Sequence, residues 1–357
     1  MRSQITQANT SRQSNIELLR IIAMLGVVIL HYNSVGGGFD HVPQGGVSMW
    51  LPYGLEGLFI GCVNLFVLIT GFFSCTQQSR KLGKALALFL QVSVFQLLAF
   101  CIRLLRGQAW SFRALLISLI PNNYFVSLYV ALYFLSPYLN ILLGKLSQTG
   151  IRRLLITSLV LFSLWPTATE CLDSLLPENF LGLSSISLSG SLNGYSIVNF
   201  VLMYLAGASL RLLDIRVKKR YSGPVLILTA LVLALWGHFD TTTGMARAYC
   251  NPLVILEAIA AFLFVRQLQF HSKLVNALSA GAFTCFLLHS ALLDFYQIPK
   301  AVVKPAIFVA GHIIFTATSI YLISYVAFRV YNIISAPLIR TLNRLPERKS
   351  TAVQQEE

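Results

Sequence analysis

The chain has 357 residues, of which 56% are hydrophobic and only 11% are charged, with a mean hydropathy of +0.70. Soluble domains carry about 25% charged residues, so this composition excludes a soluble protein and is typical of one that crosses a membrane many times. The net charge of +14 is scattered in short runs between apolar segments, whereas nucleic-acid binders gather basic residues on one face, so we expect no nucleic-acid partner. The six Cys show no metal-ligand spacing, so we expect no metal site.

Ten apolar stretches approach the roughly 20 residues that a membrane-spanning helix needs, and they predict an all-α, polytopic membrane protein. The predicted spans are about 16–34, 55–75, 85–102, 124–143, 152–168, 196–213, 224–239, 251–268, 277–296 and 306–328. No small-residue cleavage site follows the first stretch, so we interpret it as a retained helix and not as a signal peptide. The predicted organisation is therefore a polar N-terminal segment 1–15, a membrane domain 16–330 and a basic C-terminal tail 331–357.

The distribution of Lys and Arg predicts the orientation in the membrane. With a cytoplasmic N-terminus, only six of the 27 Lys and Arg fall in outer segments, and these are Arg103, Arg106, Arg113, Arg247, Lys300 and Lys304. Cytoplasmic segments of membrane proteins carry the excess of basic residues, so we expect both termini in the cytoplasm.

Two outer segments differ in character from the other connectors. Segment 35–54 is rich in Gly, and segment 169–195 has no Lys or Arg but contains Glu170, Asp173 and Glu178. Long ordered loops often bind a ligand, so an acceptor could lie under 169–195, although a plain linker explains it equally well. Cys171 and Cys250 both fall outside, where a disulfide is possible in an oxidising envelope.

The first predicted span combines a long apolar run with Arg20 near its start and His31 near its end. Eleven helical steps of about 100° come close to three full turns, so both side chains leave the same face, roughly 16 Å apart along the axis. Ionisable groups within the bilayer are costly unless they face a polar interior. The alternative is that Arg20 is a snorkelling anchor and His31 an interfacial residue.

Other ionisable residues divide between the two halves of the predicted spans. The outer half contains Glu56, Glu257, His289, Asp294 and His312 in addition to His31. This set favours a hydrated cavity that opens outward, although each group alone could satisfy a local hydrogen bond between helices. The inner side carries a cationic rim of Arg20, Arg80, Lys81, Lys84 and the run 216–220. Such a rim suits a polyphosphate ligand, but topology alone explains most of it.

Several motifs, in order along nearly the whole chain, resemble acyltransferase family 3, membrane enzymes that O-acylate cell-envelope polysaccharides and related glycans. Arg20 and His31 fit its first-helix signature, in which ten residues separate Arg from His. The run 63–72, VNLFVLITGF, is similar to its second-helix pattern ending in Ser-Gly-Phe/Tyr, with Thr70 replacing Ser. Further similarity lies in Arg80 and Lys84, in Tyr124-Phe125-Val126 with Pro137, in 200–211 with Gly207, and in Leu278-Ser279 through Phe286-Leu287-Leu288-His289. Tyr124 and Phe286 depart from the usual Trp and Tyr, which leaves the subgroup open.

The resemblance implies a transmembrane O-acyltransferase of the bacterial inner membrane that uses acetyl-CoA or a close acyl-CoA as donor substrate and binds no other cofactor. The acceptor would be a hydroxyl of an envelope glycan or a lipid-linked saccharide. His31 is expected to act as general base, or alternatively as a transient acyl carrier, because imidazole titrates near neutral pH. Arg20 would anchor the donor phosphates, assisted by Arg80 and Lys84. Glu257 or His289 would orient His31 or contact the acceptor, and Tyr32, Asn33 or Asn64 would stabilise the oxyanion.

Two other functions remain open at this point. A transporter or flippase for lipid-linked glycans also has about ten spans and buried ionisable groups, although the sequence shows no internal repeat. A purely structural membrane scaffold would leave the alignment of Arg20 with His31 unexplained.

Overall fold

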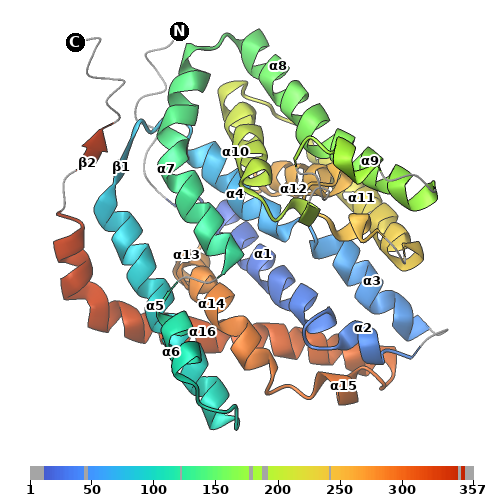
Figure 1. Cartoon of the computed structure of the whole chain (residues 1–357), viewed down its shortest axis with the longest axis vertical. Helices are drawn as coiled ribbons and strands as arrows, with labels where there is room; N and C mark the ends of the chain where they lie inside the picture. The colour runs from blue at the N-terminus through green and yellow to red at the C-terminus, as the bar shows by residue number, and fades with distance from the viewer. Residues whose placement is uncertain are drawn as a thin grey trace.

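The computed structural model describes residues 12–43, 47–120, 123–176, 180–186, 192–240, 243–344 and 347–349. These residues form a bundle of helices (Figure 1). Nine of the described helical segments are long and apolar enough to cross a membrane, and the shorter apolar helix Ile197–Leu212 adds a tenth element. The prediction of an all-α, polytopic membrane protein is therefore confirmed. The outer parts of the predicted terminal segments, 1–11 and 350–357, lie outside the described residues.

The elements follow one another with short connections. The first part of the chain forms α1 (Ser14–Asn33), α2 (Gly38–His41), α3 (Val47–Phe59), α4 (Cys62–Ser74), β1 (Ser79–Lys81), α5 (Leu82–Leu105), α6 (Phe112–Leu119) and α7 (Tyr124–Lys145). The middle part forms α8 (Gln148–Leu159), a π-helical turn (Val160–Leu164), α9 (Trp165–Leu175), 3-10 turns at Leu181–Leu183 and Leu192–Gly194, α10 (Ile197–Leu212) and α11 (Lys219–Phe239). The last part forms a 3-10 turn (Met245–Arg247), α12 (Pro252–Val265), α13 (Lys273–Leu278), a 3-10 turn (Ser279–Gly281), α14 (Ala282–Leu293), α15 (Ile298–Ala301), α16 (Ala306–Leu342) and β2 (Glu347–Lys349).

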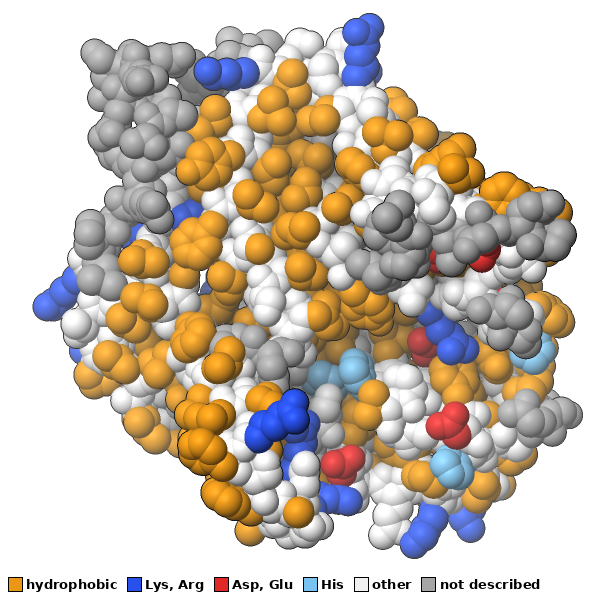
Figure 2. Space-filling view, viewed as in Figure 1, with side chains coloured by type: hydrophobic (Ala, Val, Ile, Leu, Met, Phe, Trp, Pro, Cys, Tyr) orange, Lys and Arg blue, Asp and Glu red, His pale blue; other side chains and the backbone are white. Residues whose placement is uncertain are grey.

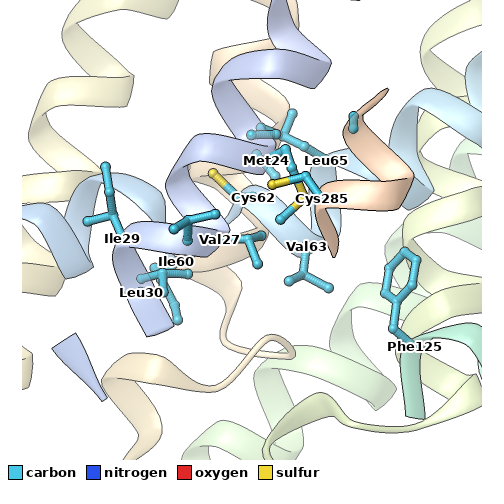
Figure 3. Close-up of a cluster of buried hydrophobic side chains, with 14 of the residues drawn as sticks. Met24, Val27, Ile29, Leu30, Ile60, Cys62, Val63, Leu65, Phe125 and Cys285 are labelled. Carbon is cyan, nitrogen blue, oxygen red and sulfur yellow. The ribbon is translucent and has the colours of Figure 1, made fainter. Parts of the chain in front are cut away.

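Helix α1 runs through the middle of the bundle (Figure 1). Its apolar side chains are almost completely buried: Ala23, Met24 and Val28 expose 0% of their surface. Figure 3 shows side chains of α1, α4, α7 and α14 packed around it, among them Met24, Val63, Phe125 and Cys285. A membrane helix that is apolar on every side belongs in the interior of a bundle, and the polar residues that it does carry are then held among protein groups and away from lipid.

Helices α4 and α10 cross at two glycines that approach each other's backbone. A Cβ added to Gly71 would lie 2.2 Å from the carbonyl oxygen of Tyr204, and one added to Gly207 would lie 2.0 Å from that of Leu68. Small residues allow membrane helices to pack this closely. This contact explains physically why glycine occurs at both positions, and it fixes α4 against the core.

Three predicted boundaries are wrong in informative ways. The expected outer loop 35–54 contains α2 and the first turns of α3, so the second apolar segment begins at Ser48 and reaches Ser74 with a break near Gly61. The fifth span continues through Pro166 to Leu175, because the π-helical turn just before it accommodates the missing amide hydrogen of the proline. The last helix extends to Leu342, well past the predicted end at 328.

The two cysteines considered for a disulfide are both free thiols in the structure. Cys250 is fully buried in a small apolar cluster with Met245 and Ala248, and Cys171 packs against that cluster. Segment 169–195, expected to be an irregular outer connector, begins as the last turns of α9, and Glu178 lies outside the described residues.

Candidate active site

Four adjoining cavities follow one another along the face of α1 that carries Arg20 and His31, and neighbouring cavities share wall residues. We name each by one basic residue in its wall. They are the Arg80 cavity of about 200 Å³, the Arg20 cavity of about 390 Å³, the His31 cavity of about 290 Å³ and the Arg103 vestibule of about 320 Å³. As their spacing predicts, Arg20 and His31 lie on one helix face, since Met24 and Val27 between them also line the Arg20 cavity.

The His31 cavity contains two imidazoles in contact. His289 of α14 lies edge to face against His31, with the ring centroids 4.6 Å apart and the ring planes at 82°. His289 exposes only 3% of its surface, and its Nδ1 lies 2.7 Å from the carbonyl oxygen of Phe286 and 3.2 Å from that of Cys285. A carbonyl oxygen only accepts, so Nδ1 of His289 carries the proton and donates it. Nε2 is then the unprotonated nitrogen, and the Ser290 hydroxyl lies 3.3 Å from it.

His31 is held less firmly by hydrogen bonds than His289. Its Nδ1 is buried and has no hydrogen-bond partner among the described residues. Its position depends instead on α1 and on the edge contact with His289. An imidazole that lines a cavity without a fixed hydrogen-bond partner is free to exchange a proton with a bound group.

The rest of the His31 cavity wall is unusually polar for the interior of a membrane bundle. Besides the two histidines, its polar lining residues are Gln96, Arg103, Gln108, Ser118, Asn123, Tyr124, Tyr249 and Ser290. Asn123 caps α7 by accepting a 2.9 Å hydrogen bond from the amide of Phe125 on its side-chain oxygen, which leaves its amide nitrogen as a donor. Hydroxyl and amide groups of this kind suit a polyhydroxylated ligand, because each can donate and accept.

The Arg20 cavity is narrower in chemistry, with apolar walls and a few polar groups. Val27, Val63 and Phe286 form the wall that it shares with the His31 cavity. Arg20 is 37% exposed, and its only ion pair among the described residues is one with Glu17 at 3.4 Å. A weak, partly exposed pair of this kind contributes little, so an anionic ligand can compete for the guanidinium.

The Arg80 cavity adjoins the Arg20 cavity through Thr70 and Tyr129. Arg80 is 8% exposed, and its Nε and Nη2 donate to the Ser136 hydroxyl at 3.0 and 2.8 Å. Its guanidinium also hydrogen-bonds the Gln77 side chain and lies over the ring of Tyr133. Lys84 lines the same cavity, so two basic groups converge there with no carboxylate among the described lining residues.

The basic run 216–220 is arranged differently from Arg80 and Lys84. Arg216 donates to Asp214 at 2.9 Å, and this hydrogen bond lowers the pKa of that exposed carboxyl. No residue of the run lines any of the four cavities. The cationic rim predicted from sequence therefore separates into surface charge here and cavity-lining charge at Arg20, Arg80 and Lys84.

The structure brings together some of the predicted polar residues and separates others. His289 joins His31, and Asp294 lines the Arg103 vestibule. Glu257 does not line any of these cavities; it is 2% exposed, packs against Gly61, and its Oε2 has no partner in the described part of the chain. Glu56 accepts a 3.2 Å hydrogen bond from Asn33 in a separate buried contact.

The three residues proposed for the oxyanion all have partners elsewhere. Asn33 also donates to the carbonyl of Pro52, Asn64 donates to the carbonyl of Tyr249 at 2.8 Å, and the Tyr32 hydroxyl lies 2.9 Å from Nδ1 of His312. None of the three lines the His31 cavity. Asn123, which sequence reasoning missed, is the better placed amide, and its position at the start of a helix was the available signal.

Comparison with known proteins adds one positive finding. The acyltransferase domain model of acyltransferase family 3 matches residues 13–328, which include every cavity-lining residue named above. No curated protein and no solved structure matches the chain. A match over most of the chain, together with helices suited to crossing a membrane, identifies this protein as a membrane acyltransferase that belongs to acyltransferase family 3.

Proposed function

We propose that the protein moves an acyl group from cytosolic acyl-CoA, with acetyl-CoA as the simplest donor, to a hydroxyl of a cell-envelope glycan or lipid-linked saccharide. The observation that carries this proposal is the row of adjoining cavities that runs from Arg80 and Lys84, past Arg20, to the His31–His289 pair. Donor and acceptor then enter from opposite ends of the row. The distribution of Lys and Arg assigns the Arg80 end to the cytoplasm of a bacterial inner membrane.

The donor end matches the chemistry of coenzyme A. Its phosphates are anions that require fixed cations, and Arg80, Lys84 and Arg20 supply them along two adjoining cavities. The thin, partly apolar pantetheine arm fits the mostly apolar Arg20 cavity. A thioester at the far end of that cavity would meet the wall of Val27, Val63 and Phe286, beyond which lies His31.

The transfer step needs a base, because a sugar hydroxyl is a weak nucleophile at neutral pH. In the proposed step, His31 removes the hydroxyl proton while the oxygen forms a bond to the thioester carbonyl carbon. The carbon–sulfur bond then breaks, and the leaving thiolate takes the proton from the His31 imidazolium. His289 holds the His31 ring plane through their edge-to-face contact, and Asn123 is the candidate donor to the oxyanion. In the alternative, His31 first accepts the acyl group on its ring nitrogen and passes it to the hydroxyl.

Membranes that contain the full chain and radiolabelled acetyl-CoA test this function. We expect label in the glycan fraction with the wild-type chain and none with His31→Ala, although the variant still accumulates in the membrane. A flippase would move glycan without taking up label, so glycan transport without labelling would overturn the proposal. Comparing surface glycans of wild-type and deletion strains by mass then identifies the acyl group.

A further inference from the structure

The Arg103 vestibule continues the His31 cavity away from the donor end. Arg103 and Gln108 line both spaces, and Arg106 and Asp294 complete the vestibule. Figure 2 shows histidine, basic and acidic side chains gathered in one region of a face that is otherwise largely hydrophobic. Any acceptor whose hydroxyl reaches His31 and that projects outward therefore meets two guanidinium groups.

These guanidinium groups are not neutralised within the described part of the chain. Arg103 has no ion pair or side-chain hydrogen bond there, and Arg106 lies over the ring of Phe295 at 4.9 Å from its centroid. Asp294 lines the same vestibule but forms no ion pair within 4.0 Å. Because opposite charges in one cavity would pair if nothing else competed for them, the arrangement leaves cationic positions open to a ligand.

Their place in the sequence is also unusual. Outer segments of a membrane protein are depleted in Lys and Arg, yet Arg103, Arg106 and Arg113 crowd into one short outer segment. A basic residue near the end of α5 does interact favourably with the helix dipole. That effect explains Arg103 near a helix end, but it does not explain why its side chain forms part of the His31 cavity wall.

We infer that the acceptor carries an anionic group, a phosphate or a carboxylate, which binds Arg103 and Arg106 while the hydroxyl next to it lies at His31. Arginine binds both kinds of anion through paired, charge-assisted hydrogen bonds. The anion belongs either to the phosphate that links a saccharide to its lipid carrier or to an acidic sugar. This inference rests on the proposed function and names the chemical class of its acceptor.

The test uses Arg103→Gln and Arg106→Gln in the full chain, with Arg113→Gln as the matched control. Arg113 is exposed, belongs to the same outer segment and lines neither space. We expect each of the first two variants to lower glycan labelling about tenfold to a hundredfold, in line with the loss of charge-assisted hydrogen bonds. Arg113→Gln should leave labelling within twofold of wild type, and Arg103→Lys should restore part of the loss.

Donor binding is measured separately, as the thermal shift that coenzyme A produces in detergent-solubilised protein. The shift should survive in Arg103→Gln, so loss of labelling with an intact shift assigns the defect to the acceptor. If the proposed function is wrong, wild-type membranes show no His31-dependent labelling at all. If only the present inference is wrong, that labelling persists and Arg103→Gln and Arg106→Gln behave like Arg113→Gln.

Added probes distinguish the two sources of the anion in wild-type membranes. Inhibition by a polyprenyl phosphate indicates a lipid-linked acceptor, and inhibition by glucuronic acid indicates an acidic sugar. Glucose, which is neutral, serves as the control. Stronger inhibition by glucose than by either anionic probe would overturn the inference even if the variants failed to accumulate.

Discussion

His31 and His289 come from the first and the fourteenth α-helix, yet their imidazoles touch edge to face with centroids 4.6 Å apart. The two rings differ in what holds them. His289 is fixed by hydrogen bonds to backbone carbonyls, whereas Nδ1 of His31 is buried without a partner in the described chain. One ring is therefore a support and the other is available for proton transfer, and this division leads to the first two predictions.

Replacing His31 should remove most of the transfer activity. We expect His31→Gln to lower glycan labelling by about 10²–10⁴-fold, the range that general bases contribute. His312→Gln is the matched control, because His312 bonds Tyr32 and lies outside the His31 cavity. Equal activity of the two variants in the labelling assay, at equal protein in the membrane, would contradict the assignment.

Replacing His289 should separate orientation from chemistry. His289→Asn keeps a donor for the Phe286 carbonyl, whereas His289→Leu leaves that carbonyl and the His31 edge without a polar neighbour. We expect Asn to lower kcat roughly tenfold and Leu roughly a hundredfold, the range reported for residues that orient a reacting group. A complete loss in both variants would instead show that His289 itself handles the proton.

Replacing Arg80 should weaken donor binding while leaving the chemical step intact. We expect Arg80→Gln to raise the KM for acetyl-CoA about tenfold or more with little change in kcat, because phosphate contacts far from the reacting bond act on ground and transition state alike. Arg216→Gln is the control, since Arg216 pairs with Asp214 on the surface. A selective fall in kcat would argue against a phosphate site at Arg80.

Filling the wall between the Arg20 and His31 cavities should block the passage of the thioester. We expect Val63→Trp to abolish glycan labelling while the coenzyme A-induced thermal shift persists, because the phosphate contacts lie on the near side of the wall. The added bulk costs about 1–3 kcal/mol of stability, so Val63→Leu serves as a milder second variant. Undiminished labelling in both would show that the donor does not pass this point.

The close crossing of α4 and α10 predicts a stability effect. Gly207→Ala places a methyl group about where the Leu68 carbonyl already lies, so we expect it to lower the unfolding free energy by about 1–3 kcal/mol. Gly311→Ala is the matched control, since Gly311 is also helical but has open space around it. Thermal unfolding in detergent measures both, and an unchanged midpoint for Gly207→Ala would contradict the crossing.

Local patterns were sufficient for the fold class, for the number of apolar segments and for the shared face of Arg20 and His31. Each depends on hydropathy over about 20 residues or on a helical repeat of 3.6, and both act along the chain without reference to partners. The inner orientation of the termini stays a prediction from charge. Boundaries were less secure, because the π-helical turn before Pro166 and the helices within 35–54 depend on packing against other segments.

Which polar residues meet was decided only by tertiary packing. His289 and Glu257 looked alike in sequence, as ionisable residues at similar depth, but α14 carries the first to His31 while α12 turns the second toward Gly61. The same holds for Arg103 and Asn123, which line the His31 cavity although nothing near them in the chain marks them. Helix periodicity sets the direction of a side chain relative to its own axis, and only the crossing of helices sets what lies in that direction.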